Sequence, residues 1–134
     1  MFVDTSGWCA LFDASDQNHG KAAQLWREIS GSTARLYTSD YVLDETITLI
    51  RKKIDHESAV KFGRAILESR ITEILWVTED VWEGAWSMFQ KYRDKDFSFT
   101  DCTSFVLMKK HGVDTAFVFD HHFTQAGFLV VPLK

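Results

Sequence analysis

Proline, cysteine and long apolar runs are scarce in this sequence, and each scarcity excludes a class of structure. Pro132 is the only proline among 134 residues, so no proline-rich linker divides the chain. The longest apolar stretches fall far short of the ~20 residues that span a bilayer, and the chain begins without the basic and apolar regions of a signal peptide. We therefore expect no membrane association and a cytoplasmic location, where Cys9 and Cys102 are free thiols.

An excess of positive charge, the usual mark of a nucleic-acid-binding surface, is missing as well. The formal net charge is -4, whereas phosphate groups prefer a basic surface. The four carboxylates singled out below carry that whole excess, so the rest of the chain is neutral, and a bound divalent cation would neutralise the four. The charge balance therefore neither supports nor excludes an RNA substrate.

The composition that remains is that of one folded domain. Hydrophobic residues make up 46% and charged residues 25% of the chain, the balance of a soluble globular protein, and the length suits a single domain over residues 1–134. Five tryptophans and eleven phenylalanines are generous for this length. We expect some large apolar side chains of the early helices to stay exposed for a protein partner, and the candidates are Trp8, Phe12, Leu25 and Trp26.

Apolar patterning divides the chain into alternating strands and helices. Short runs of apolar, β-branched and aromatic residues predict strands at residues 1–3, 36–38, 71–77, 115–119 and 128–131. Helical spacing predicts helices through residues 8–12, 18–29, 42–50, 59–67, 81–89 and 100–111. The residues expected to open or cap helices are Ser39 or Asp40, Asp55, Thr78 or Glu79, and Thr100, and Gly112 ends the last helix. In the helix over 81–89, the side chains expected to point inward are Val81, Trp82, Ala85, Trp86 and Phe89.

This alternation predicts an α/β fold with a mainly parallel sheet covered by helices on both faces. In such sheets, ligands bind beyond the carboxyl ends of the strands. Residues that directly follow a strand are therefore the first candidates for a functional site.

Four acidic residues fall near this edge of the predicted sheet. Asp4 and Asp120 each follow an apolar strand, Asp101 lies in the first turn of a helix, and Glu45 lies one to two turns into another helix. Carboxylates gathered there would repel one another unless a cation lay between them. Oxygen ligands select Mg²⁺ or Mn²⁺, and such a hydrated ion activates water and polarises a phosphoryl oxygen. The pattern favours a metal-dependent phosphodiesterase.

Each of these acids also has an ordinary structural interpretation. An aspartate after a strand is commonly an N-cap, which for Asp4 alone is the more frequent role. Asp101 at a helix start can simply complement the helix dipole, and a helical glutamate such as Glu45 is usually solvated. However, the neighbours of Glu45 look buried, and a carboxylate near an apolar face needs a partner or a metal. The functional hypothesis rests on the joint placement of the four.

Other polar residues are weaker candidates. Thr5 and Ser6 more often cap helices than orient a water molecule, and Asp96 is better explained as a solvated loop residue. His121 and His122 suggest metal ligands, but neighbouring histidines in a short turn point different ways, so we assign them to a helix start and the surface. Basic clusters that could contact an RNA backbone lie at residues 51–53, 91–95 and 109–110.

Four segments together resemble the PIN-domain ribonucleases, most closely the toxins of VapBC-type toxin–antitoxin pairs. They are Val3-Asp4-Thr5-Ser6, Leu43-Asp44-Glu45-Thr46, Phe97 to Phe105 around Asp101, and Phe119-Asp120-His121-His122-Phe123. The resemblance covers nearly the whole chain. It implies a five-stranded parallel sheet and a Mg²⁺-dependent endoribonuclease, with Mn²⁺ as a possible substitute. It also implies a type II toxin that forms a homodimer and binds a small antitoxin, with Asp4, Glu45, Asp101 and Asp120 as the catalytic and metal-binding acids.

Three other classes of protein can be weighed against this one. A receiver domain needs adjacent acids after its first strand and a lysine after a late strand, and neither is present here. A Toprim-type site needs an Asp-x-Asp after a strand, whereas Asp94-Lys95-Asp96 follows a helix. A non-catalytic PIN-like module that only binds RNA or protein is the remaining alternative, and a lack of any metal-dependent activity would identify it.

Overall fold

The computed structural model describes residues 1–132, which are arranged around a five-stranded sheet. The strands are β1 Phe2–Val3, β2 Leu36–Ser39, β3 Thr72–Leu75, β4 Thr115–Phe117 and β5 Leu129–Val131. They lie in the order β3-β2-β1-β4-β5, and every neighbouring pair is parallel. Strands β2 and β3 follow on one side of β1, and β4 and β5 follow on the other. The direction of strand addition therefore reverses between β1 and β4, and ligands are expected beyond the carboxyl ends of these two strands.

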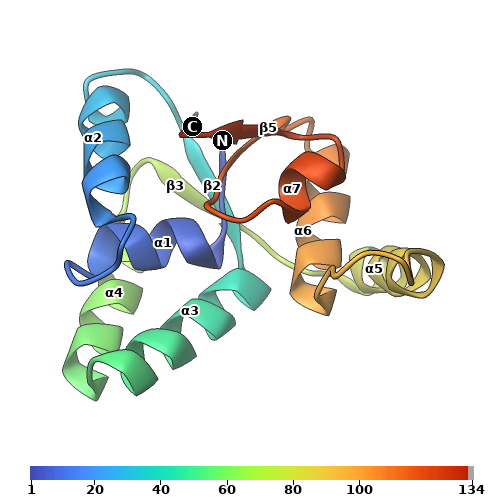
Figure 1. The fold of residues 1–134 in the computed structure, drawn as a ribbon, viewed down its shortest axis with the longest axis horizontal. Coiled ribbons are helices and arrows are strands. Elements are labelled where there is room, and N and C mark those ends of the chain that lie inside the picture. The colour runs from blue at the N-terminus through green and yellow to red at the C-terminus, as the bar shows by residue number, and fades with distance from the viewer. Residues whose placement is uncertain (133–134) are drawn as a thin grey trace.

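Helices cover both faces of the sheet, as the alternating pattern predicted. The helices are α1 Thr5–Phe12, α2 His19–Ser30, α3 Asp40–Lys53, α4 His56–Glu68, α5 Glu79–Lys91, α6 Phe99–Lys110 and α7 His122–Gln125. Figure 1 shows α1 to α4 on one side of the strands and α5 to α7 on the other. The α/β fold class and the parallel five-stranded sheet are therefore confirmed. No helix within residues 1–132 is long and apolar enough to cross a membrane.

Side-chain caps fix where three of the helices begin. The Ser39 hydroxyl accepts a hydrogen bond from the Val42 N–H at the start of α3, and the Asp55 carboxylate accepts one from the Ser58 N–H at the start of α4. Helix α6 is capped by Ser98, two residues before the predicted cap at Thr100. The prediction was wrong there because both residues are good caps, and only Ser98 forms a reciprocal capping box with a later acid.

The core is filled by large side chains from the strands and from α1. Phe2, Val3 and Phe117 of the central strands are fully buried. Trp8 is 1% exposed, and its indole N–H donates a hydrogen bond to the Thr38 hydroxyl at 3.1 Å. Trp8 is therefore a core residue and unavailable to a partner. Of the other early-helix candidates, Leu25 and Trp26 are half-buried against the core, and Phe12 is 44% exposed.

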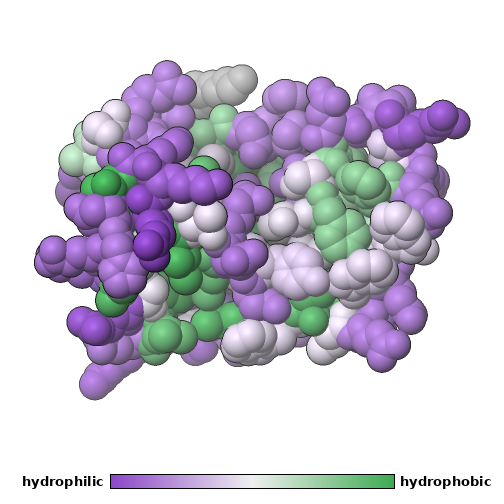
Figure 2. Space-filling model, turned by 90° about the horizontal axis from the view of Figure 1, so that it is seen from below, coloured by the Kyte–Doolittle hydropathy of each residue, from purple (hydrophilic) through white to green (hydrophobic). Residues whose placement is uncertain are grey.

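Helix α5 exposes aromatic rings that the sequence pattern pointed inward. Trp82, Trp86 and Phe89 are 41%, 45% and 42% exposed. The helix turns Val81 and Ala85 into the core. Among the described residues, the only ring outside α5 that the aromatic stripe beside them meets is that of Phe99 at the start of α6, at centroid distances of 5.2 to 6.5 Å, and the stripe stays partly exposed. We call Trp82, Trp86 and Phe89 the α5 aromatic surface. Figure 2 shows pale and green side chains gathered on the right, over α5 and α6.

Candidate active site

Asp4 is the most deeply placed of the four acids. It directly follows β1 and holds the N-cap position of α1, yet its side chain makes no capping hydrogen bond. Its Oδ1 atom is buried and has no hydrogen-bond partner within residues 1–132. Burial raises the pKa of Asp4 well above its ordinary value of 3.8, and the charges of Asp101 and Asp120 raise it further. The side chain therefore does not have the capping role that was its ordinary interpretation.

Asp101 combines a structural role with a place in the site. Its Oδ2 atom accepts a hydrogen bond from the Ser98 N–H at 3.0 Å, which completes the capping box of α6. The same oxygen lies 3.1 Å from Nδ1 of His122. Burial raises the pKa of Asp101 although the hydrogen bond from Ser98 opposes that shift, and the charge of Asp120 adds to the rise. The helix-start interpretation of Asp101 is thus correct but incomplete.

Asp120 lies in the loop between β4 and α7. Strand β4 ends at Phe117, so the strand predicted over residues 115–119 is too long by two residues. The chain leaves the strand because the Phe119 N–H donates to the Ser6 hydroxyl at 3.0 Å, a contact from α1 that no local pattern reveals. Asp120 is partly exposed, and its Oδ1 atom accepts a hydrogen bond from the His122 N–H at 2.9 Å.

Glu45 reaches the site from the other side of the sheet edge. It lies in the second turn of α3 and is half-buried. The next residue, Thr46, is fully buried, and its hydroxyl lies 3.3 Å from that of Thr5 at the start of α1. This contact joins α3 to the helix that follows Asp4. The charge of Glu45 adds to the rise in the Asp4 pKa, after burial and the two aspartates.

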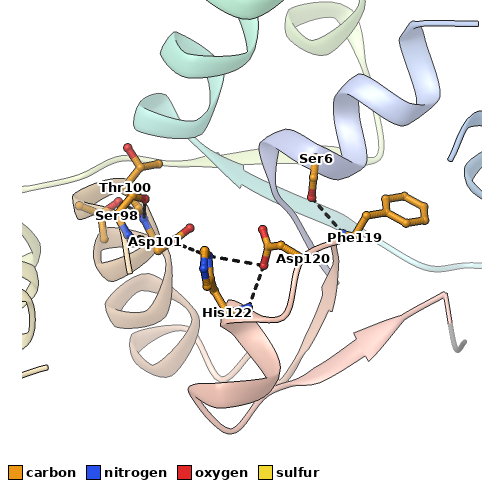
Figure 3. A network of polar contacts seen from close by, with 8 residues as sticks. Ser6, Ser98, Thr100, Asp101, Phe119, Asp120 and His122 are labelled. Atoms are coloured by element: carbon orange, nitrogen blue, oxygen red, sulfur yellow. Dashed lines mark hydrogen bonds and ion pairs between the residues drawn. The ribbon is translucent and has the colours of Figure 1, made fainter. Parts of the chain in front are cut away.

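The structure brings the four acids to one edge of the sheet, where Asp4 lies within the electrostatic reach of the other three. Figure 3 shows Asp101 and Asp120 facing each other from α6 and the loop after β4, with His122 between them. As they stand, no three acidic, histidine or cysteine side chains of residues 1–132 converge tightly enough to hold one ion. The donor set nevertheless suits Mg²⁺ or Mn²⁺, because it is all carboxylate and includes the unpaired, buried Oδ1 of Asp4.

His122 is the site residue that sequence reasoning missed. We assigned it to a helix start and the surface, and it does open α7, but its side chain is only 21% exposed and lies 3.1 Å from Asp101 and 3.8 Å from Asp120. The available signal was its position two residues after Asp120 in a short turn. There, an aspartate side chain can accept a hydrogen bond from the backbone two residues later, which turns His122 back toward the acids.

The remaining candidates stay outside this cluster or serve the fold. Asp96 is exposed in a loop. Cys102 is fully buried, and burial raises the pKa of its thiol to about 11, which makes it a poor nucleophile at neutral pH. Among the basic residues, Lys110 pairs with Asp80 at 3.0 Å.

Comparison of sequences relates the chain to known ribonucleases. The profile of the PIN domain family matches residues 1–129. The 23S rRNA-specific endonuclease VapC20 of Mycobacterium tuberculosis is 40% identical over 131 residues, which are 98% of this chain and 97% of that protein. A VapC ribonuclease of Archaeoglobus fulgidus is 29% identical over 111 residues, which are 81% of this chain and 69% of that protein.

Comparison of structures agrees with the sequences. The crystal structure of VapC20, described as a toxin that cleaves the sarcin–ricin loop, superposes with a TM-score of 0.88 at 39% identity and covers 96% of this chain and 95% of its own. FitAcB from Neisseria gonorrhoeae shares the fold at 14% identity, with a TM-score of 0.69 over 98% of this chain and 96% of its own. With a family profile that spans 129 residues and a relative that is 40% identical over almost the full length of both chains, the chain belongs to the PIN domain family.

Proposed function

We propose that this chain is an endoribonuclease that depends on Mg²⁺ or Mn²⁺ and acts as the toxin of a toxin–antitoxin pair. The observation that carries the proposal is the state of the carboxylate oxygens. Asp4 has a buried oxygen without a partner, and Asp101 and Asp120 each use one oxygen for hydrogen bonds and leave the other free within the described residues. A buried charged carboxylate without a partner is costly, and a cation held among the three acids would remove that cost for Asp4.

We assign separate roles in metal binding and proton transfer to the four acids. When bound here, a divalent ion would make a water molecule more acidic and stabilise negative charge on a phosphoryl oxygen. Asp4, Asp101 and Asp120 would hold the ion through their free oxygens. Glu45 is more exposed than Asp4 and Asp101, so it can complete the ligand set or accept a proton from the attacking water.

The comparisons support RNA as the substrate class and suggest which RNA to test first. VapC20 carries 23S rRNA specificity in its name and matches this chain over almost its full length. We therefore propose 23S ribosomal RNA as the first candidate substrate. Such an enzyme would act in the cytoplasm, where the two buried cysteines stay reduced.

The test is cleavage of purified ribosomal RNA with the ends mapped at single-nucleotide resolution. Cleavage should require Mg²⁺ or Mn²⁺, stop with a chelator, and disappear in Asp4→Asn. A transcript of unrelated sequence serves as the control substrate. Full activity after exhaustive chelation would contradict the metal dependence, whereas RNA binding without cleavage at any metal concentration would indicate the binding-only module instead.

We propose that the antitoxin occupies a groove between α3 and α4. The groove has a volume of about 530 Å³ and is lined by apolar side chains that include Ile47, Val60 and Leu67, which are 39%, 40% and 74% exposed. Arg51, Arg64 and Glu68 also line it. Because the two arginines outnumber the one glutamate, the fitting segment is apolar with acidic flanks. Leu67→Lys should prevent co-purification with the product of the adjacent gene and leave RNA cleavage intact, and an unchanged complex would contradict this placement.

We propose a second copy of the chain as the occupant of the α5 aromatic surface. Its rings form one contiguous stack, with ring centroids 6.0 Å apart for Trp82 and Trp86 and 6.2 Å apart for Trp86 and Phe89. Contiguous exposed aromatic surface marks protein interfaces. Light scattering after size exclusion should show a dimer for the parent and a monomer for Trp86→Glu, and a monomeric parent would refute the assignment.

A further inference from the structure

His122 contacts Asp101 through its ring and Asp120 through its backbone. Nδ1 of His122 lies 3.1 Å from Oδ2 of Asp101, and the His122 backbone N–H donates to Oδ1 of Asp120 at 2.9 Å. Asp101 comes from α6 and Asp120 from the loop after β4, so His122 links carboxylates from two separate elements. Figure 3 shows both contacts converging on this residue.

These contacts determine which carboxylate oxygens remain available. Oδ2 of Asp101 accepts a hydrogen bond from the Ser98 N–H and lies 3.1 Å from Nδ1 of His122. Within residues 1–132, no hydrogen bond reaches the second oxygen of either Asp101 or Asp120. Fixing one oxygen of a carboxylate restricts rotation of the group, so the other oxygen is presented in one direction.

The packing around His122 makes it a suitable support. Its ring meets the Phe97 ring edge-on, with ring centroids 6.1 Å apart. The following residue, Phe123, is fully buried and anchors α7. His121 is exposed, and the centroid of its ring lies 4.7 Å from that of the His122 ring on the side of solvent, without a side-chain hydrogen bond within the described residues. The imidazole of His122 therefore occupies a defined position.

We infer that His122 is a positioning residue for metal binding, whose ring nitrogen Nδ1, 3.1 Å from Oδ2 of Asp101, holds that carboxylate so that its free oxygen is presented to a divalent cation. The inference rests on the proposed function in that it takes the acids to bind Mg²⁺. Groups that contact a metal ligand without touching the metal, and so fix the orientation of that ligand, contribute about 10- to 100-fold to metal affinity. His122 touches no reacting atom in this role.

The experiment compares Mg²⁺ binding by the full-length parent and three variants, measured by calorimetry without RNA. His122→Ala keeps the backbone N–H to Asp120 and removes the contacts of the ring, at 3.1 Å with Asp101 and 3.8 Å with Asp120. His122→Asn places an amide N–H near the position of Nδ1 and should rescue binding. His121→Ala is the matched control, because it removes the neighbouring histidine that makes no contact with the acids.

His122→Ala should weaken Mg²⁺ binding by at least about tenfold, while His122→Asn and His121→Ala stay within about twofold of the parent. In cleavage assays, the defect of His122→Ala should show as a raised Mg²⁺ requirement and recover toward the parental kcat at saturating metal. Equal Mg²⁺ affinity of His122→Ala and His121→Ala would overturn the inference, as would a parent that binds no divalent cation. A parent that binds Mg²⁺ but cleaves no RNA would refute the proposed function alone, and the binding comparison would still decide the role of His122.

Discussion

Replacing Asp4 by asparagine should separate catalysis from stability. The substitution keeps the shape of the side chain and removes its charge. Because Asp4 is buried beside three other acids, its charge opposes folding when no metal is bound. Asp4→Asn should therefore abolish RNA cleavage and yet give a metal-free protein that is more stable than the parent at neutral pH.

The size of the gain follows from the surroundings of Asp4. Repulsion from Asp101, Asp120 and Glu45 contributes at most about 3 kcal/mol, at about 1 kcal/mol for each neighbour in a partly solvated site. Desolvation adds to the gain, because the buried amide costs about 1 kcal/mol and the charged carboxylate that it replaces costs more, so the net gain is at least about 2 kcal/mol. For 134 residues this corresponds to a rise in Tm of about 8 °C, at roughly 4 °C per kcal/mol.

The gain should depend on pH in a defined direction. The folded protein holds the Asp4 proton more tightly than the unfolded chain does, because the folded pKa lies well above 3.8. As the pH falls through the folded pKa, the folded parent takes up a proton at Asp4, and the difference between the free energies of unfolding of the variant and the parent becomes smaller. Near pH 3.8 the unfolded carboxyl is protonated as well, so the Tm values of the parent and the variant should converge.

Thermal melts with and without Mg²⁺ test this reasoning beside a cleavage assay. Mg²⁺ at about 100 times its Kd should stabilise the parent by about 2.7 kcal/mol and the variant by much less. Asp55→Asn is the matched control, because Asp55 does cap its helix and is exposed, so removing its charge should give no gain. Parental cleavage by Asp4→Asn, or a lower Tm than the parent at neutral pH without metal, would refute the assignment of Asp4.

Three further substitutions should have distinct effects. Glu45→Gln should reduce cleavage by about a hundredfold or more and change the free energy of unfolding by less than about 0.5 kcal/mol, which paired kinetics and melts will show. Gly7→Ala should destabilise the fold by about 3 kcal/mol, because a Cβ atom there would lie 2.4 Å from the Phe117 carbonyl oxygen, and a parental Tm would contradict this. Trp8→Phe should lower the free energy of unfolding, measured in urea, by about 2 kcal/mol, because the variant loses the hydrogen bond to Thr38 and leaves a void in the core.

Much of the fold was predictable because it depends on local pattern. Strands of a parallel sheet are buried on both faces and read as short apolar runs, which located β1 and β2 to within a residue or two. Gly112 ends α6 with a φ of +67°, a conformation that favours glycine. The predicted start of β4 was correct. Its predicted end and the predicted start of α6 were wrong, because a contact from Ser6 and reciprocal hydrogen bonds between Ser98 and Asp101 decide them.

The sequence by itself determined where the acids gather, since acids placed after strands of a parallel sheet meet at one edge whatever the details of packing. Only the tertiary structure decided how each acid is used. It left Oδ1 of Asp4 buried without a partner and placed His122 between Asp101 and Asp120. It also decided which aromatic residues fill the core, because Trp8 and Trp86 both lie on apolar helix faces and only Trp8 meets a neighbouring element that buries it. Periodicity identifies a face, but burial depends on what packs against that face, and this is set by segments distant in the chain.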